Sequence, residues 1–273
     1  MIVFPNCKIN LGLNIISKRS DGFHNLETVF YPLPLRDSLE IISDESGDVS
    51  FTSSGISIPG SAEGNLCIKA YDLLKKDFPQ LPGIKMHLHK SIPIGAGLGG
   101  GSADGAYTLL LLNRKFQLAI SEENLIDYAL QLGSDCPFFI INKPCFATGR
   151  GEQMEPLPVD LAAYKFVIVN PQIHINTGWA FSQLSPAKPV QSVKDIVCQP
   201  VENWKASLFN DFEQPVVKQY PEIAGIKDTL YAQGAVYASM SGSGSTVYGL
   251  FPAPATPQFD FPAHYLALDL PSI

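Results

Sequence analysis

Apolar and polar residues alternate along the first stretch of the chain, from Cys7 to Ile16. One set of positions is wholly apolar: Ile9, Leu11, Leu13 and Ile15. The positions between them are polar or small: Lys8, Asn10, Gly12 and Asn14. A period of two predicts a half-buried strand. Its polar face is expected to meet solvent, as most such faces do, unless Lys8 and Asn10 together serve a site.

Similar short runs recur through the rest of the chain. Asp21-Gly22 is a strong hairpin signal that leads into a strand over residues 26–31 and presents Phe23 and His24 at its start. Further strands are expected over residues 39–42, 49–52, 84–89, 165–170, 236–240 and 246–251. The opening third of the chain is therefore predicted to be rich in antiparallel β-structure.

Helical periodicity appears between these strands. Asn65 is expected to cap a first helix that Pro79 ends. Ser102 is expected to cap a second helix that runs to Lys115. Later helices are predicted over residues 121–133, near residues 177–184 and between residues 213 and 234. The chain is thus predicted to be of mixed α+β class.

Composition narrows the class of protein. The 273 residues are 45% hydrophobic and 16% charged, which is typical of a soluble globular chain with one large or two modest domains. Glycines and prolines suggest a boundary near residues 155–162, and residues 186–200 are typical of a loop. A net charge of −7 argues against nucleic acid or a membrane surface as partner.

The five cysteines have no C-x-x-C spacing, so neither a disulfide framework nor a zinc site is expected. Free thiols favour a reducing compartment. No apolar run is long enough for a membrane span, and the start of the chain has no secretory signal pattern. A cytoplasmic location is therefore expected.

The most informative stretch is a glycine-rich run with five glycines between residues 95 and 101. Glycines add nothing to a packed core and lose the most backbone entropy on ordering, so such a run indicates close approach of the backbone to a ligand. The helix predicted after it would point free N–H groups and a positive dipole end at one place, which suits phosphate. The whole candidate phosphate loop is Pro93, Ile94, Gly95, Ala96, Gly97, Leu98, Gly99, Gly100, Gly101, Ser102 and Ala103.

Three other kinds of loop compete with a phosphate loop at this stretch. A flexible surface turn rarely needs more than two glycines. The letters match the G-x-G-x-x-G dinucleotide motif, but Glu122 and Glu123 begin a helix where an acidic residue should end a second strand. A Walker loop is excluded, because no Gly-Lys-Ser/Thr follows the glycines. A phosphate loop of another kind is predicted.

Two further stretches carry candidate chemistry. Asp135 lies between a helix end, a proline and a very apolar run, where a carboxylate is costly unless it is paired or hydrogen-bonded. Taken alone, Asp135 could simply cap a helix. The small-residue stretch from Ser241 to Ser245 could be a plain hairpin turn or a second backbone loop beside bound phosphates.

The glycine loop resembles the ATP-phosphate loop of the GHMP kinase superfamily, which includes galactokinases, homoserine kinases and mevalonate kinases. The stretch Ser241, Gly242, Ser243, Gly244 is similar to the third motif of that superfamily. Residues 8–13, 21–24 and 132–139 resemble the members that phosphorylate the C2 hydroxyl of a cytidyl diphosphate methylerythritol in non-mevalonate isoprenoid synthesis. The resemblance extends over essentially the whole chain.

This resemblance implies two domains. An ATP-binding GHMP kinase domain like ribosomal protein S5 domain 2 is expected over residues 1–157, and a ferredoxin-like GHMP kinase domain over residues 158–273. It implies ATP and Mg²⁺ as cofactors, without naming protein ligands for the metal. A small-molecule substrate is expected, with no nucleic acid, no membrane and no required oligomer.

The resemblance also assigns roles to single residues. Lys8 and Asp135 are expected to be catalytic, and Asn65 joins the loop in binding ATP. The substrate positions are Asn10, Phe23, His24, Arg150 and Phe181, with the aromatic ones near the cytosine. Family members often have Tyr in place of Phe23 and Val in place of Arg150, so a phenol hydrogen bond is lost and a cation is added.

The expected reaction is phosphoryl transfer, which needs positioning and charge stabilisation. Asp135 would accept the hydroxyl proton as general base, and Lys8 would stabilise that carboxylate and the developing charge. Two rival functions remain open. One is a GHMP kinase for homoserine, a sugar or mevalonate, which would not need Phe23 and His24 as a cytosine site. The other is a non-catalytic nucleotide-binding protein, which would have little use for both Lys8 and Asp135.

Overall fold

The computed structural model describes residues 1–44, 47–61 and 64–271. Two compact units divide the chain. Unit 1 comprises residues 1–7, 35–94 and 99–142, and unit 2 comprises residues 8–34, 95–98 and 143–273. These units interleave along the sequence, so they are not the two consecutive domains expected on either side of residue 157; that boundary stays a prediction.

Unit 1 is built on a four-stranded sheet in the order β1-β4-β6-β5. Its strands are β1 (Ile2–Val3), β4 (Ser38–Asp44), β5 (Val49–Gly55) and β6 (Gly83–Lys90). Strand β6 pairs antiparallel with β4 and parallel with β5. Along β6, buried and exposed residues alternate, so one face of the sheet lies in the core.

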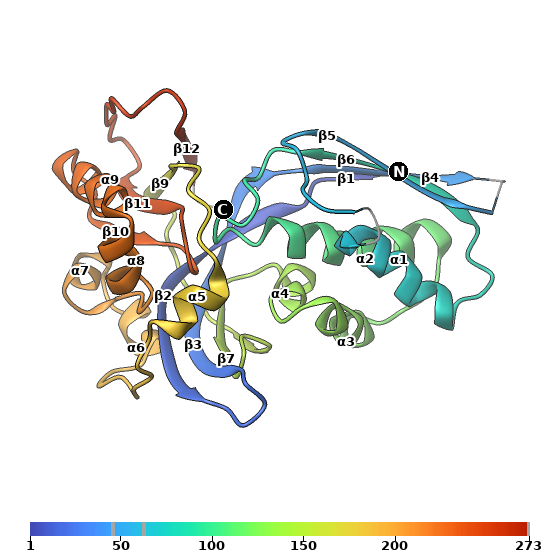
Figure 1. Ribbon diagram of the computed structural model, residues 1–273, viewed down its shortest axis with the longest axis horizontal. Coiled ribbons are helices and arrows are strands. Elements are labelled where there is room, and N and C mark those ends of the chain that lie inside the picture. The colour runs from blue at the N-terminus through green and yellow to red at the C-terminus, as the bar shows by residue number, and fades with distance from the viewer. Residues whose placement is uncertain (45–46, 62–63, 272–273) are drawn as a thin grey trace. The chain divides into compact units, whose positions relative to one another are not determined.

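Helices cover that buried face (Figure 1). They are α1 (Leu66–Asp77), α2 (Gly100–Phe116), α3 (Glu122–Leu132) and α4 (Cys136–Ile141). Asn65 and Ser121 are the N-caps of α1 and α3, as predicted, and each side chain accepts a backbone N–H. The prediction that Ser102 caps α2 is wrong: the N-cap is Gly99, and the helix begins at Gly100.

Unit 2 holds most of a second sheet, in the order β2-β3-β7-β8. Its strands are β2 (Asn6–Lys18), β3 (His24–Arg36), β7 (Cys145–Thr148) and β8 (Gln153–Pro156). The predicted hairpin at Asp21-Gly22 joins the first two, and both strands extend beyond their predicted ends. Most of β2 is buried on both faces.

The third sheet, also in unit 2, has the order β10-β11-β9-β12. Its strands are β9 (Tyr164–Asn170), β10 (Tyr237–Met240), β11 (Val247–Pro252) and β12 (Leu266–Pro271), and all neighbours are antiparallel. In chain order this is the 4-1-3-2 arrangement of a ferredoxin-like sheet. Residues 253–265, before the last strand, contain no helix.

Short helices surround this sheet in unit 2 (Figure 1). They are α5 (Thr177–Ser182), α6 (Val193–Val197), the 3₁₀ turn η2 (Val201–Asn203), α7 (Trp204–Ser207), α8 (Glu213–Gln219) and α9 (Pro221–Ala232). Helix α6 lies inside the expected loop over residues 186–200. Side chains of α8 and α9 pack with Leu13 and Ile15 of β2 and with the sheet in one apolar core.

All five cysteines are free thiols, and Cys198 alone is exposed. In the described ranges, no helix is both long and apolar enough to cross a membrane.

Candidate active site

Lys8 and Asn10 form a buried polar cluster on β2, in unit 2. The Lys8 ammonium donates to Asn10 Oδ1 at 2.7 Å and lies 4.6 Å from the centre of the Phe30 ring. Asn10 Nδ2 donates to Thr28 Oγ1 at 2.9 Å, and that hydroxyl donates to the Gly12 carbonyl. Lys8 is 4% exposed and Asn10 is 2% exposed. The polar face of this strand is therefore not a solvated surface.

The third motif meets the glycine loop and β2 at Ser241. Its hydroxyl donates to the Gly97 carbonyl at 2.8 Å and accepts the Asn10 N–H at 3.3 Å. The Lys8 N–H donates to the Leu98 carbonyl at 2.9 Å. Gly97 has φ +77°, and a β-carbon there would overlap the Ser241 carbonyl oxygen. Stretches far apart in sequence therefore meet within unit 2, and the glycine at 97 is required by close backbone approach.

The turn from Ser241 to Ser245 is a hairpin connection that also contacts the backbone of the glycine loop, and its place beside bound phosphates stays a prediction. It joins β10 to β11, and the Gly244 N–H closes it on the Ser241 carbonyl at 3.0 Å. Asn210 holds it from outside, donating to the Met240 and Gly242 carbonyls at 2.7 and 2.8 Å. Ser243 lies 3.1 Å from the Thr177 hydroxyl.

Asn210 was missed by the sequence reasoning. In the sequence, Asn210 stands out only as part of a polar Asn-Asp pair just before α8. That pattern does not show that Asn210 bonds to Met240, 30 residues further along the chain.

The first turn of α2, in unit 1, presents backbone donors. Gly99, the N-cap, makes no side-chain capping bond, and the Ala103 N–H closes the first helical turn on the Gly99 carbonyl at 2.9 Å. The N–H groups of Gly100, Gly101 and Ser102 therefore have no acceptor within the helix. A β-carbon on Gly101 would meet no atom within 4 Å. This is the arrangement that binds anions.

Asp135 also lies in unit 1, at the N-cap position of α4, but its side chain makes no capping hydrogen bond. Helix α4 packs on α2. Burial raises the pKa of the Cys136 thiol to about 12, a hydrogen bond with Ser102 opposes that shift, and the charge of Asp135 adds to it. Ser102 and Asp135 are thus both neighbours of one thiol. A capping role does not account for the Asp135 carboxylate.

The predicted substrate residues of unit 2 make aromatic contacts. The His24 and Phe181 rings stack with centroids 4.8 Å apart and an angle of 17° between their planes. Phe23 is 52% exposed, and the Arg150 guanidinium lies 4.9 Å from its ring centre. The two residues that depart from the family pattern therefore contact each other.

The other predicted nucleotide residues differ in exposure. Asn65 Oδ1 accepts the Cys67 N–H at 2.8 Å, which is a capping role. Ala96 and Leu98 are buried, and the Ala96 carbonyl accepts the Thr246 N–H at 3.2 Å. Ile94 is 39% exposed, Pro93 is half-buried, and Gly95 has φ +63°. Contact of each of these residues with ATP stays a prediction. Lys8 and Asp135 lie in different units, and their catalytic pairing stays a prediction as well.

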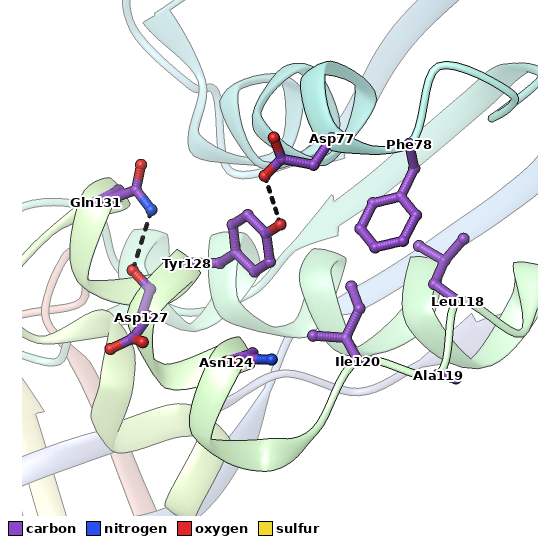
Figure 2. A pocket seen from close by; sticks show the side chains of 9 residues that line it. All are labelled: Asp77, Phe78, Leu118, Ala119, Ile120, Asn124, Asp127, Tyr128 and Gln131. Carbon is purple, nitrogen blue, oxygen red and sulfur yellow. Dashed lines mark hydrogen bonds between the residues drawn. The ribbon is translucent and has the colours of Figure 1, made fainter.

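A separate hollow of about 460 Å³ lies in unit 1, beside α1 and α3 (Figure 2). Phe78, Leu118 and Ile120 line its apolar side. The Tyr128 hydroxyl donates to Asp77 at 2.5 Å. None of its lining residues belongs to the predicted site, so it is not part of the candidate active site.

Among the described residues, no group of three or more His, Cys, Asp or Glu side chains is arranged to hold a metal ion. Mg²⁺ is usually bound by substrate phosphates and water with one or two carboxylates, and no protein ligand is assigned to it.

Comparisons with known proteins agree with the motifs. The sequence-family model for the N-terminal domain of GHMP kinases matches residues 65–143, and the family model for their C-terminal domain matches residues 199–259. The 4-diphosphocytidyl-2-C-methyl-D-erythritol kinase of Bacteroides fragilis is 53% identical over 97% of both chains. The enzyme of that name from Bacteroides thetaiotaomicron is 52% identical over 96% of both.

Solved structures give the same picture. A 4-(cytidine 5'-diphospho)-2C-methyl-D-erythritol kinase superposes with a TM-score of 0.76 at 30% identity, over 92% of this chain and 90% of that one. The mevalonate kinase of Methanococcus jannaschii superposes with a TM-score of 0.72 at 12% identity, over 100% and 98%, and so shares the fold. The chain belongs to the GHMP kinases and, among them, to the family of 4-diphosphocytidyl-2-C-methyl-D-erythritol kinases.

Proposed function

We propose that this kinase transfers the γ-phosphoryl group of ATP to the C2 hydroxyl of 4-diphosphocytidyl-2-C-methyl-D-erythritol. The relatives that match nearly the whole chain carry the name of that kinase. The observation that carries the proposal is the junction at Ser241, where the third motif binds both the glycine loop and the Lys8–Asn10 strand. A non-catalytic nucleotide-binding protein would not need a buried lysine at that junction.

The phosphates of ATP would be held by the glycine loop and the first turn of α2. The N–H groups of Gly100, Gly101 and Ser102, which have no acceptor within the helix, and the positive end of the helix dipole favour negative charge there. The open space beside Gly101 would let a phosphate approach the backbone.

The chemical step is an exchange of oxygen partners at the γ-phosphorus. The substrate hydroxyl oxygen forms the new P–O bond, the bond to the β-phosphate oxygen breaks, and ADP leaves. Asp135 would accept the hydroxyl proton as general base. Lys8 would offset negative charge on the transferred group, while its bond to Asn10 fixes the direction of its ammonium.

The cytidine side of the substrate would be recognised by the aromatic residues of unit 2. His24 and Phe181 already stack on each other, so a cytosine would extend that stack rather than enter it. Phe23 offers an exposed ring beside the cationic Arg150, which suits a planar base near a diphosphate.

Mg²⁺ would accompany ATP and neutralise charge on its phosphates. The free thiols suit a reducing compartment, so we place the reaction in the cytoplasm. We also propose that residues 1–157 form the ATP-binding GHMP kinase domain and residues 158–273 the ferredoxin-like GHMP kinase domain.

The proposal is tested by ADP release from the wild-type protein with ATP and, separately, the cytidyl substrate, homoserine, galactose and mevalonate. The cytidyl substrate should give a kcat/KM at least about a hundredfold above the others, because only it fills a site built to bond and stack a base. A preference for another alcohol would reassign the chain within the GHMP kinases. No ADP release with any of them would favour a binding protein.

A further inference from the structure

Unit 1 contains a buried ionic cluster that has no part in the chemistry above. The Lys90 ammonium, at the end of β6, pairs with Asp37 and, at 2.8 Å, with Asp104 of α2. Lys90 and Asp104 are 3% exposed, and Asp37 is fully buried. With two carboxylates and one ammonium, this ionic triad has a formal excess of negative charge.

The triad joins the two ends of the glycine loop. Asp37 Oδ1 accepts the N–H groups of Ser91 and Ile92, at 2.6 and 2.9 Å, immediately before the loop begins. Asp104 directly follows the last loop residue, and Lys90 bridges the two carboxylates. The residues that enter and leave the loop are therefore tied together through one ammonium.

Lys90 also lies under the first turn of α2. A β-carbon built on Gly100 would be 2.9 Å from the Lys90 ammonium nitrogen and 2.8 Å from Ile92. Only glycine lets the helix begin this close to β6. The turn that presents N–H groups toward phosphate therefore rests directly on the triad.

Stability alone does not explain these charges. Burying an ion pair costs hydration free energy, and the attraction between the two charges often only offsets that cost. Apolar residues can therefore replace such a pair with little loss of stability. Asp104 Oδ1 is moreover buried without a hydrogen-bond partner among the described residues. A glycine-rich loop, by contrast, has much backbone freedom to lose when it binds a ligand, and ordering its ends beforehand strengthens binding.

We propose that Asp37, Lys90 and Asp104 are positioning residues that clamp the base of the phosphate loop and thereby set the affinity for ATP. The inference rests on the phosphate loop of the proposed function. None of the three residues is assigned a contact with ATP or the second substrate; they act by holding the backbone that makes those contacts.

Asp104→Leu is the principal test, because it removes the bridge to α2 and leaves Lys90 and Asp37 as a balanced pair. Calorimetric titration with a non-hydrolysable ATP analogue should give a Kd about tenfold higher than wild type. The KM for ATP should rise in parallel, while kcat and the KM for the second substrate stay within about twofold, as expected for a loss of uniform binding.

Two variants separate positioning from general destabilisation. Asp104→Asn can still accept from Lys90 through its amide oxygen, so its Kd should lie between wild type and Asp104→Leu. Thr108→Val is the matched control. It deletes a buried hydroxyl one turn along α2 that donates to the backbone carbonyl of Asp104 at 2.7 Å, and it leaves the side-chain ion pairs of the triad in place. Its Kd should equal that of wild type.

Thermal unfolding first verifies that each variant is folded at the titration temperature. If Asp104→Leu is not folded, Asp104→Asn against Thr108→Val becomes the deciding pair. An Asp104 variant that binds the analogue as tightly as Thr108→Val overturns the clamp. Failure of the wild type to bind the analogue overturns the phosphate loop itself, so the two failures are distinguishable.

Discussion

Two buried polar networks support the glycine loop, and they differ in chemistry. In unit 1, the ends of the loop are held by ions: Asp37, Lys90 and Asp104. In unit 2, the middle of the loop is held by neutral groups, because the Ser241 hydroxyl binds the Gly97 carbonyl and the Asn10 N–H. The first network depends on protonation, and the second does not.

The difference shows in the titration of Asp104. Burial raises its pKa to about 7, although the charge of Lys90 opposes the shift and that of Asp37 adds to it. From α1, Cys67 also faces this carboxylate, and burial raises the pKa of that thiol to about 12, so it is uncharged near neutral pH. The ionic network and the hydroxyl network thus both position the loop, but only the ionic network is sensitive to pH.

Both networks should be separable from the chemical step. Asp135→Asn belongs to neither network and keeps the side-chain volume, but an amide cannot accept the proton. We expect kcat to fall by about 10²–10⁴, the range for a lost general base, with the Kd of an ATP analogue unchanged. Steady-state kinetics and calorimetry on one preparation measure both. Retention of more than a tenth of the wild-type kcat would remove Asp135 from its catalytic role.

Gly97→Ala should break the neutral network where it meets the loop. The new β-carbon would overlap the Ser241 carbonyl oxygen, and φ +77° is strained for any residue with a side chain. We expect the Kd of the ATP analogue to rise about a hundredfold, since displaced donors no longer match the phosphates. Gly225→Ala, in α9 and outside the candidate site, is the control, because its β-carbon meets no protein atom within 4 Å. Wild-type affinity in Gly97→Ala would make the junction a plain packing contact.

The smallest expected effect is on the pH dependence of stability. Folded Asp104 keeps its proton to a higher pH than the unfolded chain, so the native state binds more protons between about pH 4 and pH 7. The free energy of unfolding should therefore fall as pH rises through this window, and level off above it. Asp104→Asn has no carboxyl to titrate, so from pH 5 to pH 8 its stability should gain about 2–3 kcal/mol relative to wild type, because each of the two pH units from 5 to 7 is worth about 1.4 kcal/mol.

Ser241→Ala tests the neutral network in the same way that Asp104→Asn tests the ionic triad. It loses two hydrogen bonds of the neutral network, at a cost of about 1–3 kcal/mol that should be the same at every pH. Denaturant unfolding of both variants at several pH values measures the two trends. Equal pH dependence in Asp104→Asn and wild type would show that the ionic triad does not titrate in this window.

Local signals predicted much of the fold. The caps at Asn65 and Ser121 act through their own helices, and the Asp21-Gly22 turn acts through adjacent strands, so each is readable from a few residues. The prediction that Ser102 caps α2 was wrong because packing determines where this helix begins. Only glycine fits at position 100, against Lys90 and Ile92. Strand β12 was missed although Leu266, Leu268 and Leu270 alternate, since it pairs with a strand about 100 residues earlier.

The candidate site was predictable as a set of motifs but not as a set of contacts. The sequence singled out Lys8, Asn10, the loop and Ser241, yet the bond from Ser241 to Gly97 joins residues 144 positions apart. The ionic triad did leave a signal. Lys90 continues the buried register of Ile84, Met86 and Leu88 along β6, and a lysine at a core position requires a buried anion nearby.

The proposed reaction moves a phosphoryl group from ATP to one hydroxyl of the cytidyl substrate. Phosphorus NMR of the complete reaction tests this directly, with ADP measured in the same sample. We expect one new phosphomonoester signal, coupled to the carbon skeleton at C2, that grows in equal amount with ADP. ADP with free phosphate alone, or a phosphomonoester at another hydroxyl, would contradict it.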